Sequence, residues 1–230
     1  MTTLDIDMGN SRTKWRFGGS VGTLPSPELP ALNVEPSRVR VATVLRNRNA
    51  LGRAIADRYG VEAEFAATAA ELGGVRCGYP DPARLGVDRW LGVVAAWRGS
   101  GGPVIVISAG TAATVDFVDA NGRHEGGHIG PGLRLLRDVL DRKTVDVRPE
   151  RSVESCTAPG TDTETAVSSG TFLMLLAFAE AAVKGFAVRH GYNAEVFLTG
   201  GDADLLADGL SMPVRREPHL VLDGLEIALP

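Results

Sequence analysis

Two similar stretches decide the fold predicted for this chain: Ile6-Asp7-Met8-Gly9-Asn10-Ser11-Arg12-Thr13 and Ile107-Ser108-Ala109-Gly110-Thr111-Ala112-Ala113-Thr114. Each follows a β-rich run and leads into another, with glycine where a side chain would block close approach. Aligned without a gap, they pair Ile6 with Ile107, Gly9 with Gly110, and Thr13 with Thr114. Backbone N–H groups and small hydroxyls at such turns can hold anionic oxygens. The repeat therefore predicts two halves that each open with a strand, a phosphate-binding turn and a returning strand.

Composition narrows the class of protein. The 230 residues can bury the core of one large domain or two small lobes. A net charge of −4 gives no general attraction for nucleic acid or an anionic membrane, and basic clusters such as Arg46 to Arg48 are predicted to be solvated surface. The two cysteines, Cys77 and Cys156, show no CxxC pattern, which favours a reducing compartment. The first residues do not resemble a signal peptide, so we expect a cytoplasmic protein.

The periodicity of apolar residues predicts mixed β and α structure. The first half should contain strands over 4–8, 13–17, 39–43 and 61–65, a helix from Leu51 that ends at Gly60, and a helix opened by Gly86-Val87-Asp88-Arg89. Residues 19–37 and 73–85 are expected to be loop, edge or irregular. The second half should contain strands over 104–107, 114–118 and 196–199, helices over 133–140 and 165–186, and a strand-plus-helix pattern near 220–229. The four histidines, which show no metal-ligand spacing, are expected at the surface or in turns.

Five motifs in a fixed order resemble one family. They are Asp7-Met-Gly-Asn-Ser, Tyr79 seven residues before Gly86-Val-Asp-Arg-Trp, Gly110-Thr-Ala, Gly126-Gly-His-Ile-Gly-Pro-Gly and Gly200-Gly-Asp. Their order and spacing resemble the type III pantothenate kinases, also called Bvg accessory factor proteins, of the actin-like and sugar-kinase superfamily. The resemblance runs from about residue 4 to the C-terminus.

This resemblance implies a fold and a reaction. The fold is α/β, with two similar actin-like (ribonuclease H-like) lobes over 1–102 and 103–230 and a nucleotide cleft between them. The reaction is ATP-dependent phosphorylation of pantothenate to 4′-phosphopantothenate, the first step of coenzyme A biosynthesis. The family is typically a homodimer that binds pantothenate near the subunit interface. No nucleic-acid or membrane partner is expected.

The resemblance assigns the first turn to ATP. Its binding residues would be Asp7, Met8, Gly9, Asn10, Ser11, Arg12, Thr13 and Lys14, joined by Thr111 of the second turn. The Asp7 carboxylate would orient hydrated Mg²⁺ on the β- and γ-phosphates, and Lys14 could reach a phosphate oxygen. Taken alone, the same residues also fit an Asx-type turn beside a solvated basic strand face.

The substrate side is assigned to the block around Asp88. The family pattern makes Asp88 the base that accepts the proton of the attacking alcohol. Arg89 is a cationic fork suited to the pantothenate carboxylate, and the other substrate-binding residues would be Tyr79, Gly86, Val87 and Thr163. Without the pattern, Asp88 would be interpreted as a helix cap, and Thr163 or Thr165 as the N-cap of the long apolar helix.

One position departs from the family pattern. The second turn of these kinases usually begins Asp-x-Gly-Thr, and that Asp helps to bind a monovalent cation, K⁺ or NH₄⁺. Here Ser108 replaces it, so the cation site should be weaker or absent, unless a nearby group such as Asp116 compensates. An active kinase with an altered cation requirement is the preferred interpretation. The alternative is a catalytically weak or inactive nucleotide-binding regulatory protein of the same family.

Overall fold

The computed structural model describes residues 2–143 and 156–230, which form two compact units. The first unit contains residues 1–99 and 219–230, and the second contains residues 100–218. The change of unit near residue 100 lies close to the predicted boundary after residue 102. The last twelve residues, however, return to the first unit instead of completing the second.

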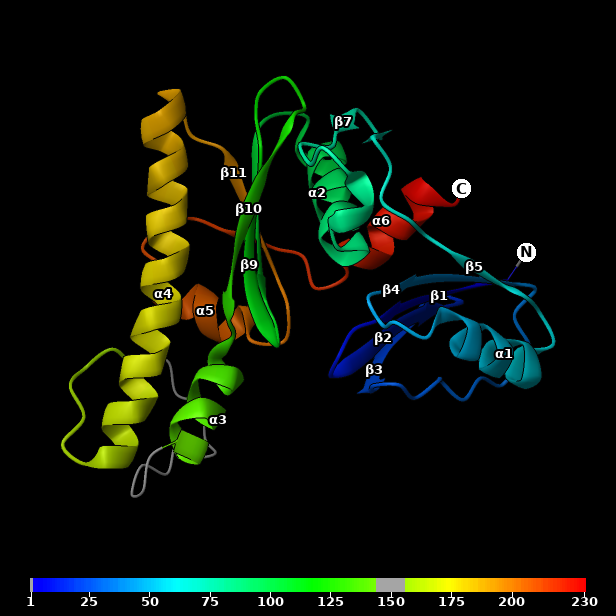
Figure 1. The fold of residues 1–230 in the computed structure, drawn as a ribbon, viewed down its shortest axis with the longest axis horizontal. Helices are drawn as coiled ribbons and strands as arrows, with labels where there is room; N and C mark the ends of the chain where they lie inside the picture. Colours follow the sequence, from blue (N-terminus) through cyan, green and yellow to red (C-terminus); the bar gives the residue numbers. More distant parts are fainter. Residues whose placement is uncertain (1, 144–155) are drawn as a thin grey trace. The chain divides into compact units, whose positions relative to one another are not determined.

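Both units are built on a five-stranded sheet with the same strand order. The first sheet runs β3-β2-β1-β4-β5 and comprises β1 (Thr3–Met8), β2 (Arg12–Phe17), β3 (Ser20–Pro25), β4 (Arg38–Thr43) and β5 (Ala63–Phe65). The second runs β10-β9-β8-β11-β12 and comprises β8 (Val104–Ala109), β9 (Ala112–Val118), β10 (His124–Pro131), β11 (Glu195–Thr199) and β12 (Arg215–Arg216). In each, three antiparallel strands are followed by two parallel ones (Figure 1). The predicted duplication of an α/β lobe is confirmed.

The two turns differ in length, which corrects the ungapped alignment of the sequence repeat. Met8 pairs with Thr13 across the first turn, whereas Ala109 pairs with Ala113 across the second, so the second turn is one residue shorter. Thr13 therefore corresponds to Ala113 and not to Thr114. By the same register, the facing pair Asp7 and Lys14 in the first unit corresponds to Ser108 and Thr114 in the second.

Strand alternation separates an apolar face from a charged face in the first sheet. Leu4, Ile6 and Met8 point to one face and are completely buried against α1 (Arg48–Tyr59). Asp5 and Asp7 point to the opposite face, where α6 (Leu220–Ala228) contacts β1 and β4 (Figure 1). The helix α1 ends at Gly60, which adopts φ +69°, as its glycine predicts.

The helices α2 (Val87–Ser100) and α6 pack closely. A side chain at Gly224 of α6 would collide with the backbone carbonyl of Leu91 in α2, so glycine is needed there. The segment predicted to be irregular holds the short hairpin β6 (Glu71–Leu72) and β7 (Val75–Arg76) and the 3-10 turn η1 (Pro82–Arg84). At 220–229 only a helix forms, and the short strand β12 precedes it.

The second unit is organised around the long helix α4 (Thr163–His190), which packs on its sheet together with α3 (Leu133–Lys143) and α5 (Ala203–Gly209) (Figure 1). By length and composition alone α4 could cross a membrane. One face of it, however, is core: Phe172, Leu175, Ala179 and Phe186 are buried against the strands. The predicted helix over 165–186 is therefore confirmed, with two or more further residues at each end.

Two expectations for the second unit are wrong. Neither Thr163 nor Thr165 is the N-cap of α4, because the Asp162 carboxylate accepts the Thr165 N–H at 2.9 Å and Thr165 completes the capping box. His124 is not at the surface: it is completely buried, with its Nε2 atom 2.9 Å from Oδ1 of Asp116.

Candidate active site

The charged face of β1 brings three of the predicted site residues together within the first unit. Asp7 lies opposite Lys14 in the β1–β2 pair. The pKa of the Asp7 carboxyl is raised to about 7, chiefly by burial and next by the nearby negative charge of Asp88, while Lys14 opposes both effects. Burial likewise lowers the pKa of Lys14, while Asp7 opposes that change. Asp7 therefore carries a proton for part of the time near neutral pH.

Asp5, two residues earlier on the same face, has a different environment. Its carboxylate accepts hydrogen bonds from Arg40, with Nε at 2.7 Å, and from Arg16, with Nε and Nη2 at 3.3 Å. Arg16 also bonds Asp223 at 2.7 Å and Glu226 at 3.0 Å, which lie on α6. Asp5 is therefore the centre of an ion-pair network that attaches α6 to the sheet, whereas burial and the nearby charge of Asp88 raise the pKa of Asp7.

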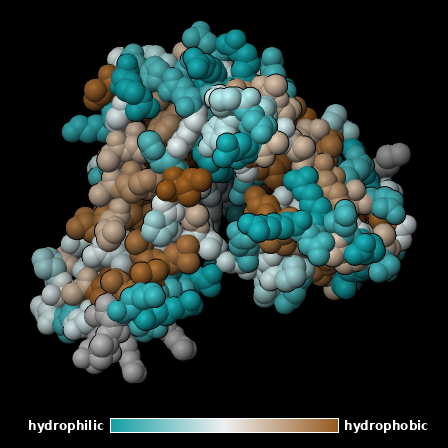
Figure 2. All heavy atoms as spheres, in the orientation of Figure 1, coloured by the Kyte–Doolittle hydropathy of each residue, from teal (hydrophilic) through white to brown (hydrophobic). Residues whose placement is uncertain are grey.

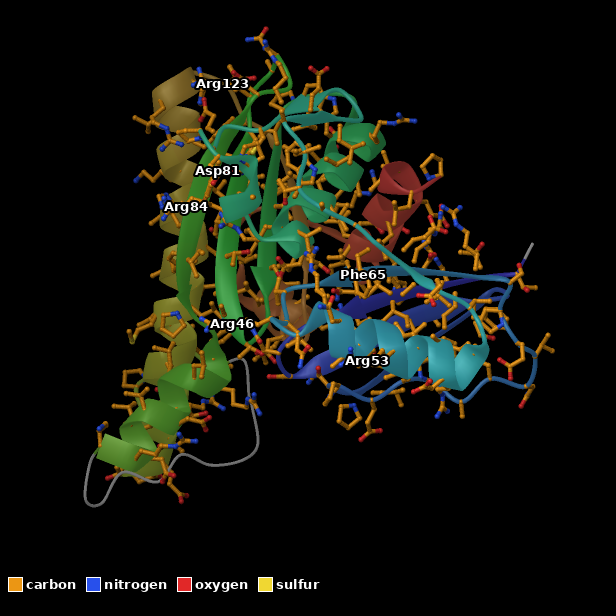
Figure 3. All side chains as sticks on the ribbon, turned by 45° about the vertical axis from the view of Figure 1, so that its right-hand side comes forward. Arg46, Arg53, Phe65, Asp81, Arg84 and Arg123 are labelled. Carbon is orange, nitrogen blue, oxygen red and sulfur yellow. The ribbon has the colours of Figure 1, made fainter. Side chains whose placement is uncertain are left out.

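The residues of the first turn differ in their exposure to solvent. Gly9 N–H donates to the Arg12 carbonyl at 3.0 Å, which closes the turn, and Asn10 and Arg12 are exposed. Met8 and Thr13 are completely buried, so their side chains are not available to a nucleotide. The Met8 carbonyl is itself bonded to the Thr43 hydroxyl, and the ATP contacts expected at these two positions stay a prediction. The basic residues Arg46 and Arg48, which follow β4, are exposed as predicted (Figure 3 labels Arg46).

The predicted substrate block is also brought together within the first unit. Arg89 donates from Nη1 to the Tyr79 hydroxyl at 3.2 Å. The chain between these two residues carries Asp81 and Arg84, which Figure 3 labels. Asp88 is not an N-cap but lies in the first turn of α2, where its Oδ1 accepts the Arg89 N–H at 2.8 Å. A side chain at Gly86 would come within 2.7 Å of that oxygen. Glycine at 86 therefore leaves the Asp88 carboxylate accessible, while Val87 is buried in the core.

The glycine motifs of the second unit converge on its turn. The Thr111 carbonyl accepts the Gly132 N–H at 3.0 Å, and the Ala109 carbonyl accepts the Asp202 N–H at 2.9 Å. A side chain at Gly132 would collide with the Gly110 carbonyl, and one at Gly200 with the Ala109 carbonyl. These motifs lead directly into α3 and α5, which agrees with their interpretation as plain turns before helices. Their glycines also allow the backbone to approach the second turn closely.

Ser108, which occupies the expected monovalent-cation position, has an uncharged residue opposite it in the β8–β9 pair. Ser108 faces Thr114. Asp116 lies two residues after Thr114 on the same strand, opposite Val106. The register places Asp116 on the same face of the sheet as Ser108, where it is buried and bonded to His124, so compensation by Asp116 stays a prediction. Thr163, predicted to contact pantothenate, is exposed at the first residue of α4.

Sequence analysis missed Arg137, a buried cation in α3. Arg137 donates to the Thr171 hydroxyl at 3.1 Å and to the Ser168 hydroxyl at 2.9 Å, both on α4. Burial lowers the pKa of its guanidinium, and the charge of Asp202 opposes that change. The sequence did contain a signal that Arg137 is buried, because it follows the apolar Leu133 by one turn on the same face of the predicted helix.

The repeated sheet, with antiparallel and parallel strands in the same order in both units, defines a duplicated, actin-like α/β fold. Two solved structures share the fold. A conserved putative Baf family transcriptional activator from Campylobacter jejuni has a TM-score of 0.65 at 19% identity, covering 97% of this chain and 95% of the other. The ethanolamine utilization protein EutJ from Carboxydothermus hydrogenoformans has a TM-score of 0.54 at 15% identity, covering 100% and 90%.

Sequence similarity is more specific than the fold. A family model described as type III pantothenate kinase matches residues 3–185. A type III pantothenate kinase of Chromohalobacter salexigens is 37% identical, covering 99% of this chain and 87% of that protein. One of Pseudomonas putida F1 is 39% identical, covering 99% and 98%. The chain belongs to the type III pantothenate kinase family.

The environments of Asp5 and Asp7 predict that removing the two charges has opposite effects on the free energy of unfolding. The raised pKa of Asp7 means that the folded protein keeps a proton that the unfolded chain loses, so stability falls as pH rises from about 4 to about 7. We expect Asp7→Asn to increase the free energy of unfolding at pH 8 by about 2 kcal/mol, since partial exposure reduces the full effect. Urea unfolding at pH 5 and pH 8 measures this.

Asp5→Asn is the matched control on the same strand face. It should destabilise the protein by about 3 kcal/mol at both pH values, because it leaves the buried Arg40 and Arg16 without their shared carboxylate. An Asp7→Asn variant that is less stable than the wild type at pH 8 would contradict the assignment of a strained carboxylate at this position.

Proposed function

We propose that this chain transfers the γ-phosphoryl group of ATP to the primary alcohol of pantothenate, giving ADP and 4′-phosphopantothenate, the first step of coenzyme A biosynthesis. Membership of the type III pantothenate kinase family supports the reaction. The observation that carries the site assignment is the presence of Asp7, Lys14 and Asp88 in one electrostatically coupled group beside the Arg89–Tyr79 pair. The enzyme is proposed to work in the cytoplasm.

Asp88 is the proposed catalytic base. The pantothenate hydroxyl oxygen attacks the γ-phosphorus, the bond from that phosphorus to the bridging oxygen of ADP breaks, and the hydroxyl proton passes to the Asp88 carboxylate. Oδ1 of Asp88 accepts the Arg89 amide at 2.8 Å, which fixes the orientation of the carboxylate. The Tyr79 hydroxyl in turn accepts a hydrogen bond from Arg89, whose guanidinium is proposed to bind the carboxylate of pantothenate.

The first turn and Lys14 are proposed to bind the phosphates of ATP, with Thr111 as a further contact. The residues present fit a nucleotide-borne Mg²⁺: Asp7 offers a hard carboxylate oxygen, and the described part of the chain holds no group of three metal-binding side chains. Mg²⁺ keeps several waters and binds phosphate oxygens, so one carboxylate acting through water suffices. When bound, the ion would neutralise phosphate charge, and its positive field would favour the ionised form of Asp7.

Replacing the proposed base tests the reaction. We expect Asp88→Asn to reduce pantothenate-dependent ADP release by at least about a hundredfold, because an amide cannot accept the proton. The fold and ATP affinity should be retained. Asp57→Asn on the exposed face of α1 is the matched control and should have wild-type turnover.

The outcomes of this assay separate the competing functions. Wild-type turnover in Asp88→Asn would remove Asp88 from the role of base. If the wild-type chain binds ATP but releases no ADP with pantothenate, a nucleotide-binding regulatory protein becomes the better hypothesis.

We further propose that the kinase has a relaxed requirement for a monovalent cation, because Ser108 faces Thr114 and neither side chain carries charge. Ser108→Asp should restore charge at this position and increase the stimulation of ADP release by K⁺ relative to a bulky inert cation, by severalfold. Ser108→Asn, which adds bulk without charge, is the control. Equal cation dependence in all three proteins would contradict the proposal.

The exposed face of α4 is the proposed homodimer interface. It carries an apolar stripe at helical spacing, formed by Leu173, Met174, Ala177, Ala181 and Val188. Met174 is 59% and Val188 76% exposed, and Figure 2 shows hydrophobic residues along the part of the surface where α4 runs. A stripe of this kind is typical of a surface that a second copy covers. Thr163, the proposed pantothenate contact, begins the same helix.

A charge on this stripe should separate the subunits. We expect Met174→Glu to raise the dimer dissociation constant at least tenfold, because the carboxylate would be buried without a partner. Sedimentation velocity measures the change. Val21→Glu, at an exposed apolar residue of the first unit, is the control and should remain dimeric. Equal dimer stability in both variants would place the interface elsewhere.

A further inference from the structure

Ser26, immediately after β3, contacts the first turn at two points. Its hydroxyl donates to the Gly9 carbonyl at 2.7 Å, and its backbone N–H donates to the Ser11 carbonyl at 3.2 Å. This position follows from the register of the sheet. Arg12, the first residue of β2, pairs with Pro25, the last residue of β3, so Ser26 lies beside the turn that precedes Arg12. Ser26 is partly buried and comes from a segment that sequence analysis predicted to be loop and edge.

The carbonyls of the turn are almost all bonded to the protein itself. The Met8 carbonyl accepts the Thr43 hydroxyl at 2.9 Å, and the Arg12 carbonyl accepts the Gly9 N–H at 3.0 Å. With the two bonds from Ser26, four of the five carbonyls from residue 8 to residue 12 are therefore held in fixed directions. A carbonyl oxygen directed at a phosphate would repel it, so these directions decide whether the turn can bind an anion.

The planar trans peptide links each carbonyl to an amide. Within one peptide unit the C=O and the following N–H point in opposite directions. Since Ser26 holds the Gly9 and Ser11 carbonyls on its own side, the N–H groups of Asn10 and Arg12 point away from Ser26. These are the amides that a phosphate-binding turn needs to direct toward its ligand.

We propose that Ser26 is a positioning residue for ATP, which acts by orienting the peptide units of the Gly9–Arg12 turn. The inference rests on the proposed binding of the nucleotide phosphates at this turn. The second turn is restrained by main-chain donors alone, since its Ala109 and Thr111 carbonyls accept the N–H groups of Asp202 and Gly132. Ala109 corresponds to Met8 and not to Gly9, so the two units restrain their turns at different carbonyls.

The test is a comparison of Ser26→Ala with Ser26→Thr in the full chain. Ser26→Ala keeps the backbone bond to Ser11 but removes the hydroxyl from Gly9, so the dissociation constant for Mg-ATP and the KM for ATP should rise about three- to tenfold. The kcat and the KM for pantothenate should change less than twofold. Ser26→Thr, which retains a hydroxyl, should restore both ATP parameters. Ser20→Ala, at the exposed start of β3, is the control.

The readouts distinguish this role from a purely structural one and from failure of the proposed reaction. Melting temperature is measured for each variant, and a loss of stability with unchanged ATP affinity would overturn the proposal. So would wild-type ATP parameters in Ser26→Ala. Equilibrium binding of Mg-ATP needs no acceptor, so the Ser26 comparison remains decisive even if pantothenate proves not to be phosphorylated.

Discussion

The structure of the first unit depends on how β1 buries two carboxylates on one face. The opposite face of the strand carries Leu4, Ile6 and Met8, which are buried in the apolar core against α1. Asp5 is compensated by Arg40 and Arg16, and the same guanidinium of Arg16 reaches the C-terminal helix. The positive charge of Lys14 opposes the effects of burial and of Asp88 on Asp7, but the pKa of Asp7 stays raised, so its anion is poorly stabilised. One residue of the pair therefore stabilises the fold, and the other is the carboxylate that we propose for the ATP site.

The duplication shows how an equivalent backbone carries different side chains at matching positions. The register places Asp7 and Lys14 of the first unit where the second has Ser108 and Thr114. An oppositely charged pair suits the charged phosphates and their metal ion, whereas two hydroxyls form a nearly neutral surface. At the next equivalent position, Arg16 is replaced by Asp116, whose partner His124 comes from the neighbouring strand. The halves thus retain strand order and turn position while their electrostatics have diverged.

Sequence predicted the main elements because their signals are local. Alternation along β1 and β4, the stop at Gly60 and the apolar run of α4 each depend on residues within a few positions of one another. The proposed site could also be put forward from the sequence, since Asp7, Asp88 and Arg89 lie in short motifs. What could not be predicted arises from pairing between distant segments. The shorter second turn, the buried Asp116–His124 pair, the return of α6 to the first unit and the contact of Ser26 with Gly9 all depend on register or on tertiary packing.

The means by which each turn is restrained has an evolutionary consequence. In the first unit the Met8 and Gly9 carbonyls depend on the side-chain hydroxyls of Thr43 and Ser26, which a single nucleotide change can remove. In the second unit the donors are main-chain N–H groups, which every residue except proline supplies. The second turn instead depends on Gly132 and Gly200, where any side chain would collide with a carbonyl. The two halves of one duplicated fold therefore tolerate different mutations. The first turn is sensitive to substitutions that remove a hydroxyl, and the second to substitutions that add even a single methyl group to a glycine.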